Sequence, residues 1–246
     1  MNRFCHMGVT QGGYGADMEQ FKRFAVYYAP PEGDFADATA RWLGWDLAKG
    51  RAVPGGQPLG LPRAREDLTR GASVYGFHGT LKAPFRLAPG VTELDLAQGC
   101  AALAKEISPV VMPGLRLSNL GGFLALTPLG DETELLDLGA EVVTRLDLFR
   151  ADLTPQEIAR RRPERLTPRQ RMLLDQWGYP HVLDEFRFHL TLTDSVPAPD
   201  RAAVAEVLER EVLTQMPRPF VIADLCLCAE DQEGHFHLRS RHALGG

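Results

Sequence analysis

The order of predicted elements repeats within this chain, and that repetition constrains its fold more than any other feature. A first copy over about 73–129 predicts a strand, a helix and two strands, at 75–83, 93–107, 115–120 and 122–129. A second copy over about 186–241 predicts the same order, at 186–193, 199–214, 220–228 and 235–241. A duplication with paired strands after each helix favours antiparallel over parallel pairing. We therefore predict a bilobal α+β fold with pseudo-twofold symmetry, two antiparallel sheets with helices packed outside, and a central cleft.

The remaining segments surround the two copies. An aromatic and β-branched run predicts a strand at 22–29, because such residues suit a half-buried pleated surface. Apolar spacing and Thr-Pro starts predict helices at 34–48, 132–149, 154–162 and 167–177. Residues 50–72 are rich in Gly, Pro and Arg and predict a surface loop.

Length and charge set limits on class and partners. The chain has 246 residues, a formal net charge of −5 and four cysteines. That charge gives no basic surface for gripping long nucleic acid. Residues 1–20 are Gly-rich and polar, so we expect a loose leader and not a signal peptide, followed by one bilobal domain over 21–246. We expect a cytoplasmic monomer without membrane contact, since no apolar run approaches the length of a span.

The four cysteines give no C-x-x-C pair and do not indicate a zinc site or disulfide framework. Cys226 and Cys228 lie two apart in an apolar run, which places them on one face of a strand. We interpret them as small buried residues in a reducing compartment.

The strand that opens each copy carries His-x-Thr, as His78-Gly79-Thr80 and His189-Leu190-Thr191. Side chains alternate between the two faces of a strand, so each motif presents its histidine and threonine on one polar face. A lone histidine on a strand is more often a satisfied structural residue. Two such motifs at matching repeat positions point instead to one shared site.

Two imidazoles facing one phosphorus atom suit phosphodiester cleavage without a metal or another cofactor. Imidazole titrates near neutrality, so one can take a proton from water while the other protonates the leaving oxygen. Thr80 and Thr191 can donate to non-bridging phosphate oxygens. By strand alternation, Lys82 and Arg187 belong to the same polar faces and add positive charge for substrate binding.

YGFHGTLKAPF and FRFHLTLTD resemble the paired motifs of the two-histidine (2H) phosphoesterases, which include RNA 2',3'-cyclic phosphodiesterases and the so-called 2'-5' RNA ligases. The resemblance implies a bilobal fold, with His78 and His189 catalytic and Thr80 and Thr191 on the phosphate. RLTPRQRMLLDQWGYPHV and EFRFHLTLTD resemble a branch named for phosphonate metabolism, with His181 where an aromatic is expected. This implies a cyclic phosphodiesterase for a small substrate, such as a phosphoribosyl 1,2-cyclic phosphate.

Several weaker signals keep alternatives open. Tyr28 is a candidate to flank the cleft and stack on substrate, or a core tyrosine. His235 and His237 form a metal pair or, as we favour, a structural one. A basic run could guide a phosphate or an RNA end, or form a solvated surface; it comprises Arg160, Arg161, Arg162, Arg165, Arg169 and Arg171.

Two rival functions remain. An RNA 2',3'-cyclic phosphodiesterase or RNA-end ligase would use the basic run, although RNA is the less favoured partner. A non-catalytic module that binds a phosphorylated metabolite would not need two proton-transfer groups. The substrate and the division of acid and base between His78 and His189 are left open by the sequence.

Overall fold

A computed structural model describes residues 21–246. The leader expected over 1–20 lies outside the described residues. The strands are β1 Arg23–Tyr28, β2 Trp45–Asp46, β3 Arg51–Ala52, β4 Gly79–Phe85, β5 Val110–Met112, β6 Leu115–Leu120, β7 Phe123–Pro128, β8 Leu190–Ser195, β9 Phe220–Ile222, β10 Asp224–Glu230 and β11 Phe236–Ala243. The α-helices are α1 Asp34–Leu43, α2 Arg65–Ser73, α3 Glu93–Ala104, α4 Thr133–Arg145, α5 Pro155–Arg160, α6 Pro168–Trp177 and α7 Arg201–Glu211.

The predicted duplication is present in the element order. The first copy is β4-α3-β5-β6-β7 and the second is β8-α7-β9-β10-β11. Corresponding strands of the two copies also meet, since β4 pairs with β8 and β5 with β9, all antiparallel. The α+β class with antiparallel sheets is therefore confirmed.

The two halves form one continuous seven-stranded sheet, in the order β11-β10-β1-β4-β8-β7-β6. Its two parts join through a single residue pair, Gly79 with Leu190. Each copy's terminal hairpin lies in the other copy's part of the sheet: β7 pairs with β8, and β10 reaches β4 through β1. The strands that carry the two motifs therefore lie at the centre of the molecule.

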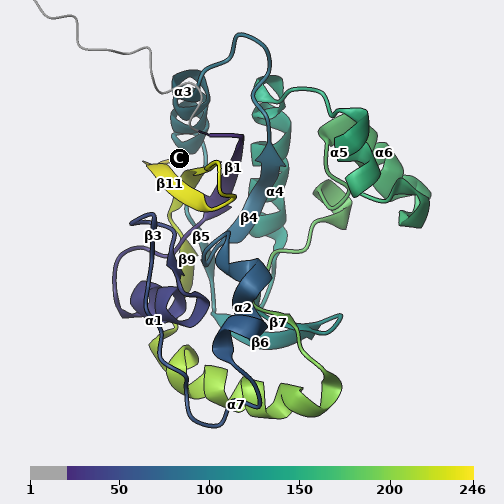
Figure 1. Cartoon of the computed structure of the whole chain (residues 1–246). Coiled ribbons are helices and arrows are strands. Elements are labelled where there is room, and N and C mark those ends of the chain that lie inside the picture. Colours follow the sequence, from purple (N-terminus) through teal and green to yellow (C-terminus); the bar gives the residue numbers. More distant parts are fainter. Residues whose placement is uncertain (1–20) are drawn as a thin grey trace, which may run out of the picture.

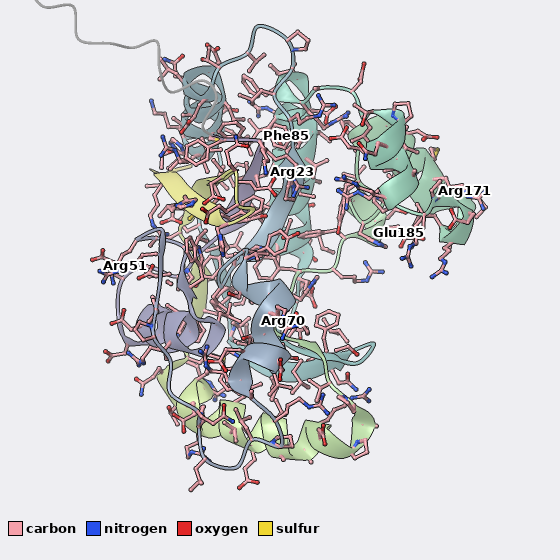
Figure 2. All side chains as sticks on the ribbon, viewed as in Figure 1. Arg23, Arg51, Arg70, Phe85, Arg171 and Glu185 are labelled. Atoms are coloured by element: carbon pink, nitrogen blue, oxygen red, sulfur yellow. The ribbon has the colours of Figure 1, made fainter. Side chains whose placement is uncertain are left out.

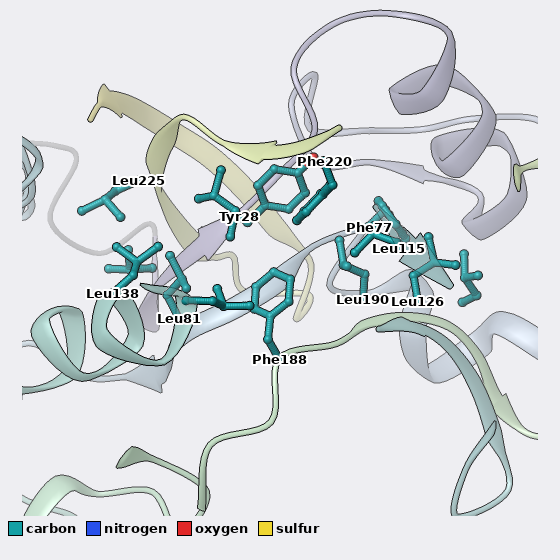
Figure 3. Close-up of a cluster of buried hydrophobic side chains, with 14 of the residues drawn as sticks. Tyr28, Phe77, Leu81, Leu115, Leu126, Leu138, Phe188, Leu190, Phe220 and Leu225 are labelled. Atoms are coloured by element: carbon teal, nitrogen blue, oxygen red, sulfur yellow. The ribbon is translucent and has the colours of Figure 1, made fainter. Parts of the chain in front are cut away.

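Five helices (α1, α2, α3, α4 and α7) contribute to one core with the sheet, whereas α5 and α6 stand together at one side (Figure 1). Aromatic and aliphatic side chains from strands, from helices and from the segments before β4 and β8 fill this core (Figure 3). A smaller cluster on the other face contains Cys226 and Cys228, both fully buried in β10 as predicted.

Several element boundaries differ from expectation. The helix expected over 34–48 ends at Leu43, and the strand expected over 220–228 is divided into β9 and β10. The predicted loop over 50–72 contains helix α2, because Leu68 and Ala72 bury an apolar edge at helical spacing. The strands expected from 75 and 186 begin only at Gly79 and Leu190, so each motif histidine lies just before its strand. The two Thr-Pro helices are confirmed, each with a capping box at its threonine.

Among residues 21–246, no helix is both long and apolar enough to cross a lipid bilayer.

Candidate active site

The two motifs meet where β4 and β8 pair. Gly79 and Leu190 are register partners, and each directly follows its motif histidine. Continuing that register places each histidine opposite the threonine of the other motif. The two histidines are then diagonal neighbours on one face, where such Cβ atoms lie roughly 7–8 Å apart. His78 and His189, which lie at matching positions of the two copies, thus come to neighbouring positions where β4 meets β8.

The glycine of the first motif allows this approach. A Cβ atom at Gly79 would lie 2.3 Å from Cζ of Phe188, whose ring fills that position. Phe188 is itself buried in the main core beside Leu190. The Phe188 ring therefore covers the core side of the β4–β8 contact and leaves no room for a side chain larger than that of glycine at position 79.

Both imidazoles are oriented by the same local bond. Nδ1 of His78 donates to the carbonyl of Gly76 at 2.9 Å, and Nδ1 of His189 donates to the carbonyl of Arg187 at 2.8 Å. A carbonyl can only accept, so each Nδ1 carries its hydrogen and each Nε2 is left for proton transfer. Nε2 of His78 also lies 3.2 Å from Oγ1 of Thr80.

The surroundings of His78 are aromatic. Its ring stacks on Tyr27 with centroids 4.0 Å apart, and Tyr75 lies 5.9 Å away. Burial is the main cause that lowers the pKa of His78 to about 4; the hydrogen bond to the Gly76 carbonyl opposes the shift, and the charge on His189 adds to it. His78 is therefore neutral at physiological pH, and the lone pair on its Nε2 lies within hydrogen-bond distance of the Thr80 hydroxyl.

A cavity of about 360 Å³ adjoins the motifs. It is lined by Thr80, Leu81, Ala83, Leu120, Phe123, Tyr179, His181, Val182, Glu185, Phe186, Arg187 and His189. The walls thus come from β4, from the β6–β7 hairpin and from the segment that precedes β8. Small-molecule sites have this size and this mixture of aromatic and polar walls.

Two of the predicted substrate-binding residues line the cavity, whereas Thr191 and the predicted catalytic residue His78 are not among its lining residues. The two that line it are Thr80 and Arg187. Thr191 is half-buried on β8, at the position that corresponds to Thr80. The Arg187 guanidinium donates to the carbonyls of Asp184 and Phe186, which hold the side chain at the rim.

Lys82 lies elsewhere than strand alternation predicts. Its ammonium is buried and donates to the carbonyl of Val143 at 3.0 Å and to Asp147 at 3.1 Å, so it links β4 to the end of α4. The register between β1 and β4 shifts between the pairs at Thr80 and Lys82, which marks a bulge in β4. The bulge reverses the alternation and turns Lys82 away from the cavity.

Tyr28 is a core residue. It is 2% exposed and packs edge-on against Phe220 and Phe188 (Figure 3). Tyr27, its neighbour on the other face of β1, is the ring that covers His78. The alternation of side chains along β1 could have predicted the core position of Tyr28, because Phe24, Val26 and Tyr28 share one apolar face.

The other weak signals resolve into structural contacts. His237 pairs with Asp231 at 2.6 Å, and His235 stacks on Trp45. Within residues 21–246, no three or more His, Cys, Asp or Glu side chains form a group that could hold a metal ion. In the basic run, Arg169 pairs with Asp184.

Sequence reasoning missed four aromatic residues and one arginine near the motif histidines or the cavity. These are Tyr27, Tyr75, Phe123, Tyr179 and Arg161, the last noted only as part of the basic run. Their contribution comes from tertiary contacts between segments distant in sequence. The sequence marks His181 only as a departure from an expected aromatic residue, yet His181 lines the cavity.

One family matches the chain over residues 80–237, with the description "Protein of unknown function (DUF1045)". The chain belongs to this family. The matched range of the DUF1045 family contains β4 from Thr80 onward and the whole second motif.

Two curated proteins contain a region similar to this DUF1045 chain. "Ribose 1,5-bisphosphate phosphokinase PhnN" of Janthinobacterium sp. (strain Marseille) is 41% identical over 180 residues, which cover 72% of this chain and 40% of that protein. A protein of the same name from Laribacter hongkongensis (strain HLHK9) is 34% identical over 181 residues, 72% of this chain and 41% of that protein. The chain thus spans about two fifths of the length of these relatives.

Solved structures with a similar arrangement include "Crystal structure of phosphoesterase" and E. coli LigT complexed with phosphate, each at 12% identity, and LigT complexed with 3'-AMP at 14%. Each alignment covers 92% of this DUF1045 chain and 99–100% of the solved chain, with a TM-score of 0.41. No residue of this chain takes its role from a likeness at this level.

Proposed function

We propose that this protein hydrolyses a small cyclic phosphodiester, with His78 as general base and His189 as general acid. The observation that carries the proposal is the matched pair of imidazoles. They directly precede two neighbouring strands, and each Nδ1 donates to the carbonyl two residues before it. A structural histidine needs no such duplicate, whereas in-line displacement at phosphorus needs an acid and a base on opposite sides.

In the proposed reaction His78 takes up one proton and His189 gives up one. Nε2 of neutral His78 takes a proton from water as the water oxygen forms a bond to phosphorus. The bond from phosphorus to one ring oxygen breaks, and that oxygen receives a proton from Nε2 of His189. The product is a phosphate monoester, and proton exchange with solvent restores both histidines. Thr80 and Thr191 donate to the non-bridging oxygens, where negative charge accumulates.

The low pKa of His78 supports its role as the base. A base must be unprotonated when substrate arrives, and burial keeps this imidazole neutral down to about pH 4. The bond from Nδ1 of His189 to the Arg187 carbonyl persists in the protonated imidazole, which suits an acid.

The cavity favours a small ester over a polymer. About 360 Å³ is at the lower end of the range for ligand pockets and matches a sugar phosphate. The relatives' printed name concerns a ribose phosphate, and we carry over only that substrate class: a phosphoribosyl cyclic phosphate of phosphonate catabolism is our candidate. The kinase activity in that name is not carried over, because this sequence contains no Gly-Lys pair and hence no P-loop.

The test compares ring opening of ribose cyclic phosphates by the wild type, His78→Ala and His189→Ala, with and without EDTA. We expect each variant to lose about 10²–10⁴-fold in kcat, the usual contribution of one acid or base, and EDTA to have no effect. His235→Ala is the matched control, because it removes an imidazole that stacks on Trp45 away from the cavity. Full activity in either motif variant, or turnover that EDTA abolishes, contradicts the mechanism.

The second candidate is an RNA-end phosphodiesterase or ligase. The exposed arginines of the basic run favour it: Arg160, Arg162, Arg165, Arg169 and Arg171. Affinity for short RNA that falls steeply with salt supports this candidate, because each phosphate contact releases counterions. Salt-independent behaviour and preference for a sugar cyclic phosphate support the first candidate.

If the histidine variants bind substrate normally and the wild type opens no cyclic ester, the site belongs to a binding module instead.

A further inference from the structure

A carboxylate lies on the wall of the cavity that adjoins the two motifs. Glu185 ends the short 3-10 turn Leu183–Glu185, and it is the acidic member of the lining residues within 21–246. Figure 2 shows Glu185 on the side of the α5–α6 unit that faces the sheet, whereas Arg171 lies at the outer edge of that unit. The proposed substrate is an anion, so phosphate binding does not explain a negative charge on this wall.

Helix α6 fixes one oxygen of this carboxylate. Nε2 of Gln170 donates to Oε2 of Glu185 at 3.1 Å. The Gln170 amide cannot turn round, because its Oε1 accepts from the backbone N–H of Thr167 at 3.1 Å in the capping box that begins α6. Among residues 21–246, no group donates a hydrogen bond to the other oxygen, Oε1 of Glu185. One acceptor atom on the cavity wall is therefore left for a ligand.

The carboxylate that precedes Glu185 is bound differently. Both oxygens of Asp184 accept hydrogen bonds from the Arg169 guanidinium, so its charge is paired on the surface. Asp184 lies outside the set of described residues that line the cavity. Leu183, which begins the turn, has a φ of 53°, a left-handed conformation that is strained for leucine. The turn thus directs one carboxylate to α6 and the next to the cavity.

The charges around the cavity limit the kind of group that can donate to Glu185. The carboxylate repels a second phosphate. Arg187 and the imidazoles of His181 and His189 line the same cavity and disfavour an ammonium group. Within residues 21–246, no ion pair joins Glu185 to Arg187. A neutral donor remains, and the free hydroxyls of a sugar ester are donors of this kind.

We propose that Glu185 is a specificity-determining residue, whose free oxygen accepts a hydrogen bond from a sugar hydroxyl outside the cyclic ester. Gln170 is the residue that positions it. The inference rests on the proposed function and adds a requirement to it: the substrate must carry a free hydroxyl on the part that enters the cavity. An analogue that lacks this hydroxyl leaves a half-buried carboxylate oxygen without a partner, so the site discriminates against it.

The pair of Gln170 and Glu185 allows one hydrogen bond to be reversed. In Glu185→Gln the new amide oxygen must accept from Gln170, so the amide NH2 group, a donor, faces the cavity. In the double variant Gln170→Glu, Glu185→Gln, the carboxylate at position 170 still accepts from Thr167 and also accepts from the amide at position 185. The amide oxygen then faces the cavity, which restores an acceptor without changing the shape of the wall.

Calorimetry measures the preference without turnover. Ribose 1-phosphate and its 3,5-dideoxy analogue are titrated into the wild type, both variants and the control Asp184→Asn, which removes the neighbouring surface carboxylate. We expect wild type and control to bind ribose 1-phosphate about 10–100-fold more tightly than the analogue. Glu185→Gln should bind both phosphates with similar affinity, and the double variant should recover part of the preference.

Three calorimetric results overturn the inference. They are equal affinity of the wild type for both phosphates, an unchanged preference in Glu185→Gln, and a loss of preference in Asp184→Asn as large as that in Glu185→Gln. The last result would assign the effect to the fold of the turn and not to the oxygen that faces the cavity.

Kinetics then separate this inference from the proposed function. Ring opening is measured for ribose 1,2-cyclic phosphate and its 3,5-dideoxy analogue. We expect Glu185→Gln to lower kcat/KM about 10–100-fold for the hydroxylated ester and to change that of the analogue by no more than about twofold. Turnover of neither ester by the wild type contradicts the proposed function alone, because the calorimetric preference decides the role of Glu185. Equal kcat/KM of the wild type for both esters contradicts the role of Glu185 alone.

Discussion

At the scale of single residues, the two motif histidines share a bonding pattern and differ in their surroundings. Tyr27 covers one face of His78, whereas His189 lies at the cavity wall near Phe123. The same His-x-Thr motif therefore produces one shielded imidazole and one that faces the cavity. This difference is the physical basis for assigning separate proton-transfer roles.

The pH profile tests that assignment. The acid limb of kcat/KM reports the base of the free enzyme, so we expect its midpoint near pH 4 and not near 6.5. Replacing Tyr27 by Ala admits water to the His78 ring and is expected to move this midpoint upward. A wild-type midpoint near 6.5 that Tyr27→Ala does not shift contradicts the role of His78.

The lowered pKa of His78 also predicts how the free energy of unfolding changes with pH. Between pH 6.5 and about 4 the unfolded chain protonates His78 more readily than the native protein does. The free energy of unfolding is therefore expected to fall as pH drops through this window, and His78 adds no further loss below it. Urea titrations of the wild type and His78→Gln measure this contribution, because the variant lacks the titrating group. Identical pH dependence in both proteins speaks against a lowered pKa.

At the scale of elements, the contact between β4 and β8 depends on one glycine. Gly79→Ala places a methyl group against Phe188, so we expect a loss of about 1–3 kcal/mol in the free energy of unfolding and lower activity. Gly56→Ala is the control, because a Cβ atom there has no neighbour within 4 Å. The double variant Gly79→Ala, Phe188→Leu should recover part of the loss. Wild-type stability in Gly79→Ala would falsify this close approach.

The bulge in β4 gives Lys82 a structural role. Removing its ammonium as Lys82→Met is expected to cost about 1–3 kcal/mol of stability and to leave KM unchanged within about twofold. Asp147→Ala should cost more, because it leaves a buried ammonium without its carboxylate. Urea unfolding and steady-state kinetics measure both effects. A raised KM with normal stability in Lys82→Met restores the substrate-binding role that the alternating pattern predicts.

At the scale of the whole molecule, the exchanged hairpins make the two copies interdependent. The hairpin β6–β7 pairs with β8 of the second copy, and β10–β11 reaches β4 of the first through β1. Each half of the sheet therefore contains strands from both copies. Neither copy has a complete sheet by itself.

We accordingly expect one cooperative unfolding transition over residues 21–246, with the same midpoint by fluorescence and circular dichroism. Fragments 1–164 and 165–246, divided in an exposed segment, should each lack that transition and should recover activity when mixed. Two separate transitions, or a stably folded single fragment, contradict a single domain.

The sequence by itself determined the duplicated order of elements, the α+β class and the meeting of the two His-x-Thr motifs. Hydrophobic periodicity and turn residues are local, and both copies repeat them. Tertiary structure alone decided the exchanged hairpins, the bulge that withdraws Lys82, and the aromatic cover over His78. These features depend on register and packing between segments far apart in sequence, where a one-residue shift changes which side chains face the site.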